Sequence, residues 1–144
     1  MHIRPYVPTD QDRALEIWLG ASRACHPFLG EAVLREQLQD VRDTYLPTAD
    51  TWIAEVEGRI EGVIGLLGRF IGGLFVDPGA HGAGIGSALV EHAAARHRVL
   101  TVSVYADNRQ AVAFYQRCGF VETARREQDD EGRPLQTIEM RREA

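Results

Sequence analysis

Three glycines at alternate positions, Gly82, Gly84 and Gly86, follow an apolar segment and open a segment of helical composition. Glycine has no side chain to keep a ligand off the backbone and adopts positive φ angles, so consecutive N–H groups can converge on one anion. Amides at the start of a helix have no partner within the helix, and the helix dipole favours negative charge there. The stretch 74–90 therefore predicts a strand, a phosphate-binding loop and the opening of a helix.

Two common phosphate-binding motifs do not match this loop. Gly79 and Gly84 have the spacing of a P-loop, but Ile85 occupies the position where a lysine is required. The glycines also fail the pattern G-x-G-x-x-G. A glycine-rich turn that only links a strand to a helix is the alternative at this point, because short motifs recur by chance.

Composition and charge narrow the classes of function. The 144 residues are 44% apolar and 26% charged, as in a globular domain that buries a full core without disulfides or metal. The formal net charge of −5 argues against nucleic acid as the main partner. It also permits a preference for basic acceptors, such as an amine or a lysine side chain. We expect a single domain over residues 1–144.

Cysteine usage and the lack of apolar runs bear on the cellular setting. Cys25 and Cys118 lie far apart without metal-ligand spacing, so neither a disulfide framework nor a zinc site is supported. No apolar run approaches about 18 residues, and the N-terminus lacks the basic-then-apolar pattern of a signal peptide. The expected setting is cytoplasmic, with no membrane segment and no metal.

The N-terminal third predicts an edge strand and two amphipathic helices. Residues 2–6 alternate in polarity, and Pro5 favours an edge position because it cannot donate to a neighbouring strand. A second helix is expected over 31–43, after a loop at 26–30. Apolar residues at helical spacing form the inward stripe of the first helix: Ala14, Ile17, Trp18, Ala21 and Cys25.

The rest of the chain predicts strands interrupted by two helices. One helix is expected at 84–97, and another runs from the N-cap residue Asn108 to Gly119, a good C′ residue. Strands are expected at 51–57, 60–67 with a turn at Gly58-Arg59, 69–76, 99–104, 120–126 and 135–141. The predicted fold is a mixed α/β (α+β) domain with a twisted central sheet of about seven strands and four helices, in the order β-α-α-β-β-β-α-β-α-β-β.

Two stretches resemble the signatures of a known family. The order Val-Asp-Pro-x-x-His-Gly-x-Gly-Ile-Gly-Ser-Ala-Leu-Val at 76–90 is similar to motif A of the GCN5-related N-acetyltransferase (GNAT) family. The stretch Asn-x-x-Ala-x-x-Phe-Tyr-x-x-x-Gly-Phe at 108–120 resembles its motif B. Each motif lies on the expected element, which makes a chance match a weak explanation. Three further stretches, 17–29, 45–47 and 129–134, resemble the small bacterial acetyltransferases of the YjaB type.

The resemblance implies acetyl-CoA as the donor and CoA as the product. In the family, the strand before the loop pairs with the pantetheine arm, and the loop amides bind the pyrophosphate. His81 departs from the family, which usually has Gln or Arg there, and a neutral imidazole offers less charge to a phosphate. Asn108 would both cap its helix and reach the CoA arm. The implied cofactor-binding residues are Phe75, Val76, His81, Gly82, Ala83, Gly84, Ile85, Gly86, Ser87 and Asn108.

The resemblance also makes Tyr115 the general acid. In the family, the tyrosine at this position lies near the CoA sulfur and gives its phenolic proton to the thiolate, and an unperturbed phenol titrates near 10. Alternatively, Tyr115 packs beside Phe114 at the end of an amphipathic helix and bonds once through its hydroxyl. No motif fixes a carboxylate as general base.

The acceptor is expected at the loop between the first two helices. His26 is a candidate on that loop, although a loop histidine before a proline needs no function. Phe28, Trp18 and Tyr45 are candidates for lining an acceptor groove. A core role is the alternative for Trp18, because it belongs to the stripe of the first helix.

Two functions from different classes remain. The leading hypothesis is an acetyl-CoA-dependent N-acetyltransferase, in which the primary amine of a small metabolite or a protein lysine attacks directly. The alternative is a non-catalytic acyl-CoA-binding sensor or interaction module on the same fold. His81 and the missing base favour the second, whereas Tyr115 within a complete motif B favours the first. The expected partners are acetyl-CoA and an amine acceptor, without nucleic acid or membrane, for a monomer or homodimer.

Overall fold

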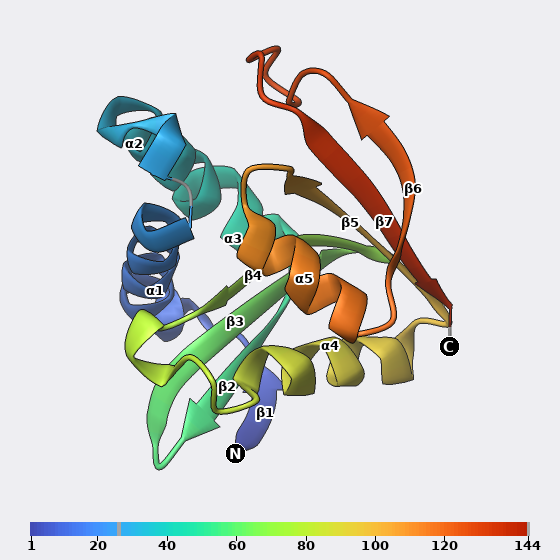
Figure 1. Ribbon diagram of the computed structural model, residues 1–144. Coiled ribbons are helices and arrows are strands. Elements are labelled where there is room, and N and C mark those ends of the chain that lie inside the picture. The colour runs from blue at the N-terminus through green and yellow to red at the C-terminus, as the bar shows by residue number, and fades with distance from the viewer. Residues whose placement is uncertain (26, 144) are drawn as a thin grey trace.

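The computed structural model describes residues 1–25 and 27–143, which form a seven-stranded mixed sheet (Figure 1). The strand order is β1-β2-β3-β4-β5-β7-β6, and every neighbouring pair is antiparallel except β4 and β5. The predicted fold class is confirmed, with the first strand at an edge of the sheet. The strands are β1 (His2–Pro5), β2 (Asp50–Val56), β3 (Arg59–Leu67), β4 (Phe70–Val76), β5 (Val99–Tyr105), β6 (Val121–Arg126) and β7 (Thr137–Glu143).

Helices cover both faces of the sheet, so neighbouring residues of one strand are both buried. Ile53 and Ala54 are consecutive in β2, yet Ile53 packs with residues of α1 and Ala54 packs with residues of α4. Successive side chains of a strand point to opposite faces, so each face has its own core. The longer helices are α1 (Gln11–Cys25), α2 (Glu31–Asp40), α4 (Ile85–Arg96) and α5 (Arg109–Arg117). The short turns are η1 (Pro8–Asp10), η2 (Pro27–Leu29), η3 (Val41–Tyr45), α3 (Leu46–Thr48) and η4 (Pro78–Ala80).

The two ends of α5 match their predicted caps. Asn108 caps α5 as predicted, because its side-chain oxygen accepts from the amide of Ala111 at 3.2 Å. Gly119 follows the same helix with a φ of 93°, as predicted for a C′ residue. None of the helices in residues 1–25 and 27–143 combines the length and apolarity needed to cross a bilayer.

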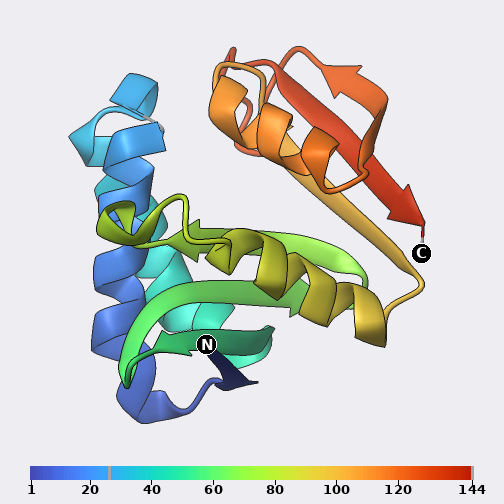
Figure 2. The same ribbon diagram turned by 60° about the horizontal axis from the view of Figure 1, so that its bottom comes forward.

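Strands β4 and β5 separate soon after they meet. Their parallel pairing is confined to Phe70 with Thr101 and Ile71 with Val102. Beyond Ile71, β4 continues to pair with β3 on its other side but no longer with β5. Figure 2 shows the two strands diverging from this point. The backbone groups of residues 72–76 that face β5 are therefore left without a strand partner.

A β-bulge at Gly72 accounts for the separation. Gly73 pairs with Gly65 of β3, and Ile71 pairs with the next residue of β3, so Gly72 is the extra residue. A bulge bends its strand and increases the local twist. A Cβ at Gly72 would lie 1.5 Å from the hydroxyl of Tyr45, so a glycine is needed at this position. The bend follows directly after the last residue that pairs with β5.

The second helix differs from the predicted single helix over 31–43. It ends at Asp40 and continues through the wider π turn η3 into α3. Pro47 has no N–H, so it cannot bond to the carbonyl four residues earlier, and a π turn shifts the bonding pattern before it. This π turn places the Tyr45 side chain on the sheet, where its hydroxyl donates to the carbonyl of Gly65 at 3.2 Å.

The turn between β2 and β3 lies one residue earlier than predicted. Strand β2 ends at Val56 and β3 begins at Arg59, so the turn residues are Glu57 and Gly58 rather than Gly58 and Arg59. Their φ angles are 54° and 77°. Positive φ at both central residues is the geometry of a type I′ turn, which matches the twist of a hairpin.

Candidate active site

A cavity of about 410 Å³ lies between the end of β4, the glycine loop and α5, and we call it the loop cavity. Nine of the ten residues that the sequence proposes for the cofactor line it. Ala83 is the exception, since it is exposed at the tip of the loop. The loop cavity also includes Gln110 and Arg117 of α5, and no Asp or Glu is among the described residues that line it.

Two of the three loop glycines are required by backbone conformation. Gly82 and Gly84 have φ angles of 84° and 78°, in the left-handed region that other residues rarely adopt. Gly84 is the N-cap of α4, and its carbonyl accepts the first helical bond from Ala88 at 3.0 Å. The amides of residues 85–87 precede that bond and have no partner within the helix. They offer donors to an anion at the positive end of the helix dipole.

Gly86 is explained by packing instead. It lies in the first turn of α4 with an ordinary helical backbone, and a Cβ there would lie 3.1 Å from the ring of Phe114. The missing side chain lets α5 approach α4 closely. Phe114 in turn lines the loop cavity, so Gly86 sets the position of one of its walls.

The loop is fastened to α1 through Asp77. Its carboxylate accepts the amide of Gly79 and a guanidinium N–H of Arg13, each at 2.8 Å. The Gly79 amide and the Arg13 charge lower the pKa of Asp77, so the carboxylate stays ionised. Arg13 also donates to the carbonyl of Ile60 at 3.0 Å. These bonds hold the turn that leads from β4 into the glycine loop.

His81 lies at the edge of the loop cavity with an exposed side chain. Its Nε2 lies 3.2 Å from the carbonyl oxygen of Val76, at the end of β4. The carbonyl can only accept, so Nε2 carries the proton in this contact. The His81 ring therefore bonds back to the strand and also borders the loop cavity.

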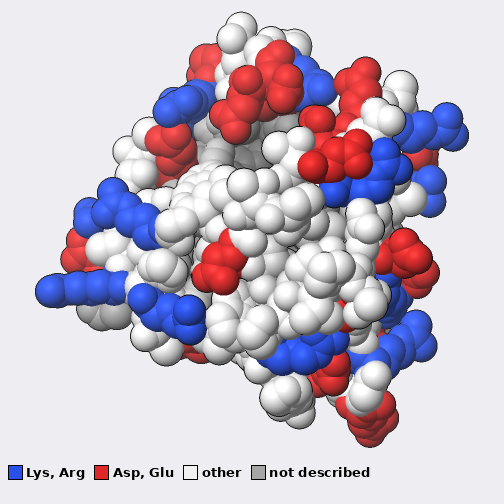
Figure 3. All heavy atoms as spheres, turned by 180° about the vertical axis from the view of Figure 1, so that it is seen from behind, with Lys and Arg blue, Asp and Glu red and all other residues white. Residues whose placement is uncertain are grey.

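A second cavity of about 580 Å³ occupies the gap where β4 and β5 separate, and we call it the strand cleft. It extends from the two strands to α2 and to the loop between β6 and β7. Figure 3 views the molecule from behind and shows a hollow at its upper edge. The loop cavity and the strand cleft share five residues: Leu74, Phe75, Asn108, Ala111 and Tyr115.

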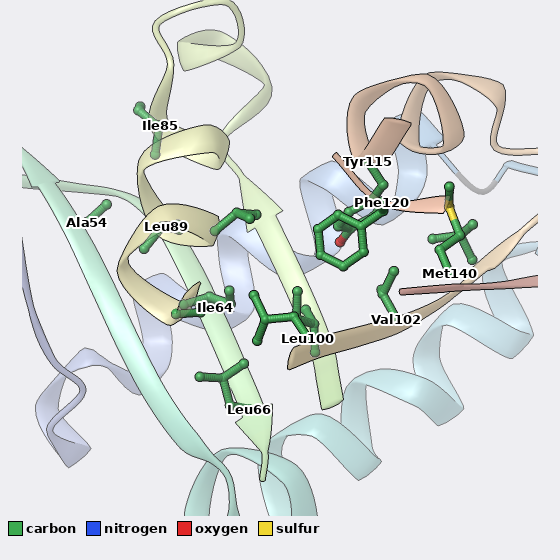
Figure 4. Close-up of a cluster of buried hydrophobic side chains, with 14 of the residues drawn as sticks. Ala54, Ile64, Leu66, Ile85, Leu89, Leu100, Val102, Tyr115, Phe120 and Met140 are labelled. Carbon is green, nitrogen blue, oxygen red and sulfur yellow. The ribbon is translucent and has the colours of Figure 1, made fainter. Parts of the chain in front are cut away.

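Tyr115 lies at the junction of the two cavities. It is 5% exposed, and its ring contacts those of Phe114 and Phe120, with centroids 5.1 and 5.2 Å apart. Figure 4 shows it with Phe120 and Met140 in the core between α5 and the sheet. Burial raises the pKa of Tyr115 above its ordinary value, so the phenol keeps its proton at neutral pH. Within the described residues, its hydroxyl has no hydrogen-bond partner.

The residues proposed for the acceptor separate into three groups. Trp18 and Tyr45 line the strand cleft, and Trp18 is also 6% exposed and packs edge-on against Phe75. Burial raises the pKa of Tyr45 to about 12, so this phenol is also neutral. Phe28 is not part of the lining; it is 37% exposed and contacts Tyr105, which does line the cleft. His26 lies outside the described residues.

The sequence missed several residues that the fold brings to these cavities. Asp40 of α2 and Glu131 of the β6–β7 loop both line the strand cleft, as does Ser22 of α1. Arg117 lines the loop cavity. No local spacing marks these residues, because each reaches its cavity through the packing of a separate element. Among the described residues, no group of three His, Cys, Asp or Glu side chains could hold a metal ion.

Comparisons with known proteins agree with this architecture. Residues 47–122 match the family model described as an acetyltransferase (GNAT) domain. Peptidyl-lysine N-acetyltransferase YjaB of Escherichia coli K12 is 38% identical over 130 residues, which cover 90% of this chain and 88% of that protein. Peptidyl-lysine N-acetyltransferase YiaC of the same organism is 39% identical over 107 residues, covering 74% of this chain and 73% of that protein.

A solved structure extends the likeness to the fold. The solution structure of the apo form of YjaB from Escherichia coli superposes with a TM-score of 0.88 at 35% sequence identity. The match covers 97% of this chain and 95% of that one. Both the separation of β4 and β5 and the glycine loop lie within the matched region of the family model. The chain belongs to the GNAT family of N-acetyltransferases, as its two motifs predicted.

Proposed function

We propose that the chain transfers the acetyl group of acetyl-CoA to the side-chain amine of a lysine in a peptide or protein. The observation that carries this proposal is the meeting of the loop cavity and the strand cleft at Tyr115. A donor and an acceptor could thus approach one hydroxyl from two sides. The relatives YjaB and YiaC are named peptidyl-lysine N-acetyltransferases, which supports lysine as the acceptor.

The described residues fit acetyl-CoA along the loop cavity. The backbone groups of residues 72–75 that face away from β3 can pair with an amide-bearing arm in the manner of an added strand. The amides of residues 85–87, beside Gly84, can bind a pyrophosphate. Acetyl-CoA supplies the acyl carbon, to which the amine nitrogen bonds as the carbon–sulfur bond breaks.

Tyr115 serves as the general acid in this proposal. It gives its phenolic proton to the sulfur as the carbon–sulfur bond breaks, and it regains a proton from water. The amine must be neutral to attack, and the product amide loses its extra proton to water. The burial that raises the pKa of Tyr115 keeps this proton in place across the neutral range. Asn108 positions Tyr115 indirectly, because it caps the helix that carries it.

Two measurements on the purified protein test the proposal. CoA at about 100 times its dissociation constant should stabilise the folded protein by about 2.7 kcal/mol, and should raise Tm by roughly 8 °C for a domain of this size. Acetyl-CoA with a lysine peptide should release free thiol and add one acetyl group to the peptide. Stabilisation without thiol release, across peptide and small-amine acceptors, would instead support a non-catalytic acyl-CoA-binding module.

A change of His81 to arginine is expected to tighten CoA binding by about threefold at low salt. The guanidinium adds a permanent charge beside the anion-binding amides, and its effect should shrink as salt screens it. Isothermal titration with CoA at two salt concentrations measures this change. His81→Gln is the matched control, since it removes the ring without adding charge. Equal affinities for the two variants at low salt would show that charge at this position does not reach the phosphates.

A further inference from the structure

The charges that line the two cavities have opposite signs. The described charged residues in the lining of the strand cleft are Asp40 and Glu131, whose side chains are exposed. Neither makes an ion pair with any residue in the described part of the chain. In the loop cavity, the charged residue of the described lining is instead Arg117. A cleft with unpaired carboxylates at its mouth favours a cationic ligand.

Arg133, a cation that also interacts with the charge of Glu131, is already paired with two other carboxylates. Arg133 of the β6–β7 loop donates to Asp129 at 3.1 Å and lies 3.9 Å from Glu36 of α2. Asp129 also accepts the hydroxyl of Tyr105 at 3.0 Å, and these donors hold its pKa below the usual range. The pair with Glu36 joins the two elements that border the mouth. Figure 3 shows acidic side chains on both sides of the hollow.

A second, independent feature points to a ligand inside the cleft. Ser22 of α1 is 1% exposed and lines the strand cleft, yet its hydroxyl has no hydrogen-bond partner among the described residues. Buried polar groups are nearly always paired, so an unpaired one at the wall of a cavity needs a partner from outside the chain. A hydroxyl both donates and accepts, so it can accept a hydrogen bond from an amine.

We infer, resting on the lysine acetyltransfer proposed above, that the strand cleft takes a lysine whose neighbouring residues in the peptide are basic. Asp40 of α2 and Glu131 of the β6–β7 loop bind cationic side chains that flank the lysine. The Ser22 hydroxyl accepts a hydrogen bond from the lysine amine within the cleft. The acidic mouth thus selects among lysines by their sequence context, while Ser22 positions the amine that reacts.

Peptide context provides the first test. Two peptides of equal length, one with arginines and one with glutamates beside a single lysine, are assayed with the full chain and saturating acetyl-CoA. The KM of the basic peptide should be about tenfold lower at low salt, and the difference should narrow as salt rises. The KM of acetyl-CoA should be the same with both peptides.

Charge removal provides the second test. Asp40→Asn and Glu131→Gln should each raise the KM of the basic peptide by about threefold, with little change for the acidic peptide or acetyl-CoA. Asp40 is exposed and makes no ion pair within the described residues, so its loss should not unfold the helix. Glu57→Gln is the matched control, because it removes the same charge at the β2–β3 turn, away from the cleft.

Ser22→Ala separates a positioning role from a structural one. If the hydroxyl only occupies space in the core, alanine should leave the KM of both peptides unchanged. If it bonds to the amine, the KM of both peptides should rise several-fold, while Tm is maintained or increases because a buried unpaired hydroxyl is gone. In both cases, the KM of acetyl-CoA should be the same for Ser22→Ala as for the unchanged protein.

The outcomes distinguish this inference from the proposed function. Equal KM values for the basic and acidic peptides at low salt would overturn the inference and leave lysine acetylation intact. Transfer to neither peptide by a protein that still binds acetyl-CoA and acetylates a small amine would overturn the lysine acceptor itself. A charge effect in the Glu57→Gln control equal to that of Asp40→Asn would also overturn the role of the mouth.

Discussion

Tyr115→Phe is expected to lower kcat by on the order of a hundredfold or more, because loss of a positioned general acid typically costs that much. The substitution removes one hydroxyl and little volume from a side chain held by ring contacts with Phe114 and Phe120. The fold and the CoA-induced rise in Tm should therefore survive. The loss should appear in kcat rather than in the KM of acetyl-CoA, since the proton is needed only as the bond to sulfur breaks.

The pH dependence sharpens this prediction. Burial raises the pKa of Tyr115 above the ordinary phenol value of about 10, so its ionisation should not limit kcat below that pH. An unperturbed phenol would change the rate near pH 10, whereas the buried phenol should change it only at higher pH. A near-normal kcat for Tyr115→Phe, measured where the chemical step is shown to be rate-limiting, would contradict the general-acid role. Tyr115 would then serve only to pack the core, and water would supply the proton.

Gly84→Val is expected to abolish the CoA-induced rise in Tm. Gly84 has a φ of 78°, and its Cβ would point into open space beside the unpaired amides at the start of α4. Valine would have to leave the left-handed region or strain the loop, and either change moves the amides that we propose bind the pyrophosphate. Differential scanning fluorimetry with and without CoA measures the effect.

Gly68→Val is the matched control for this change. Gly68 lies in the turn between β3 and β4 with a φ of 61°, and no heavy atom lies within 4 Å of its ideal Cβ. The backbone strain is therefore similar, but Gly68 lies at the opposite end of β4 from the glycine loop. The control should lower Tm in the absence of ligand and keep the CoA-induced rise. Normal CoA binding by a folded Gly84→Val protein would show that the loop does not hold the phosphates.

Features that depend only on residues close together in the chain could be predicted from the sequence. The glycine loop could be predicted because the left-handed φ of Gly82 and Gly84 is a property of the residue and its immediate neighbours. The cap at Asn108 and the C′ residue Gly119 are local in the same sense. The order of strands and helices could be predicted from hydrophobic periodicity, because the apolar residues that repeat with each period are the ones that pack against the sheet.

The π turn and the bulge show where local patterns were insufficient. Periodicity predicted a helix through residue 43, but the conflict with Pro47 is resolved by a π turn that places Tyr45 on the sheet. Gly72 reads as an ordinary strand glycine until its register against β3 is known. The bulge at that residue then bends β4 away from β5, and the strand cleft depends on this bend.

The sequence by itself determined the family, the glycine loop and the helix that carries Tyr115, because each of these is set by residues close together in the chain. Only the tertiary structure decided what faces Tyr115 across the strand cleft. Asp40 and Glu131 come from opposite halves of the chain, and their meeting at one mouth depends on how α2 and the β6–β7 loop pack. Ser22 carries no signal in the sequence, since its significance is that burial leaves its hydroxyl unpaired at the wall of the cleft. Contacts between distant elements are set by packing of the whole fold, and no spacing of residues along the chain encodes them.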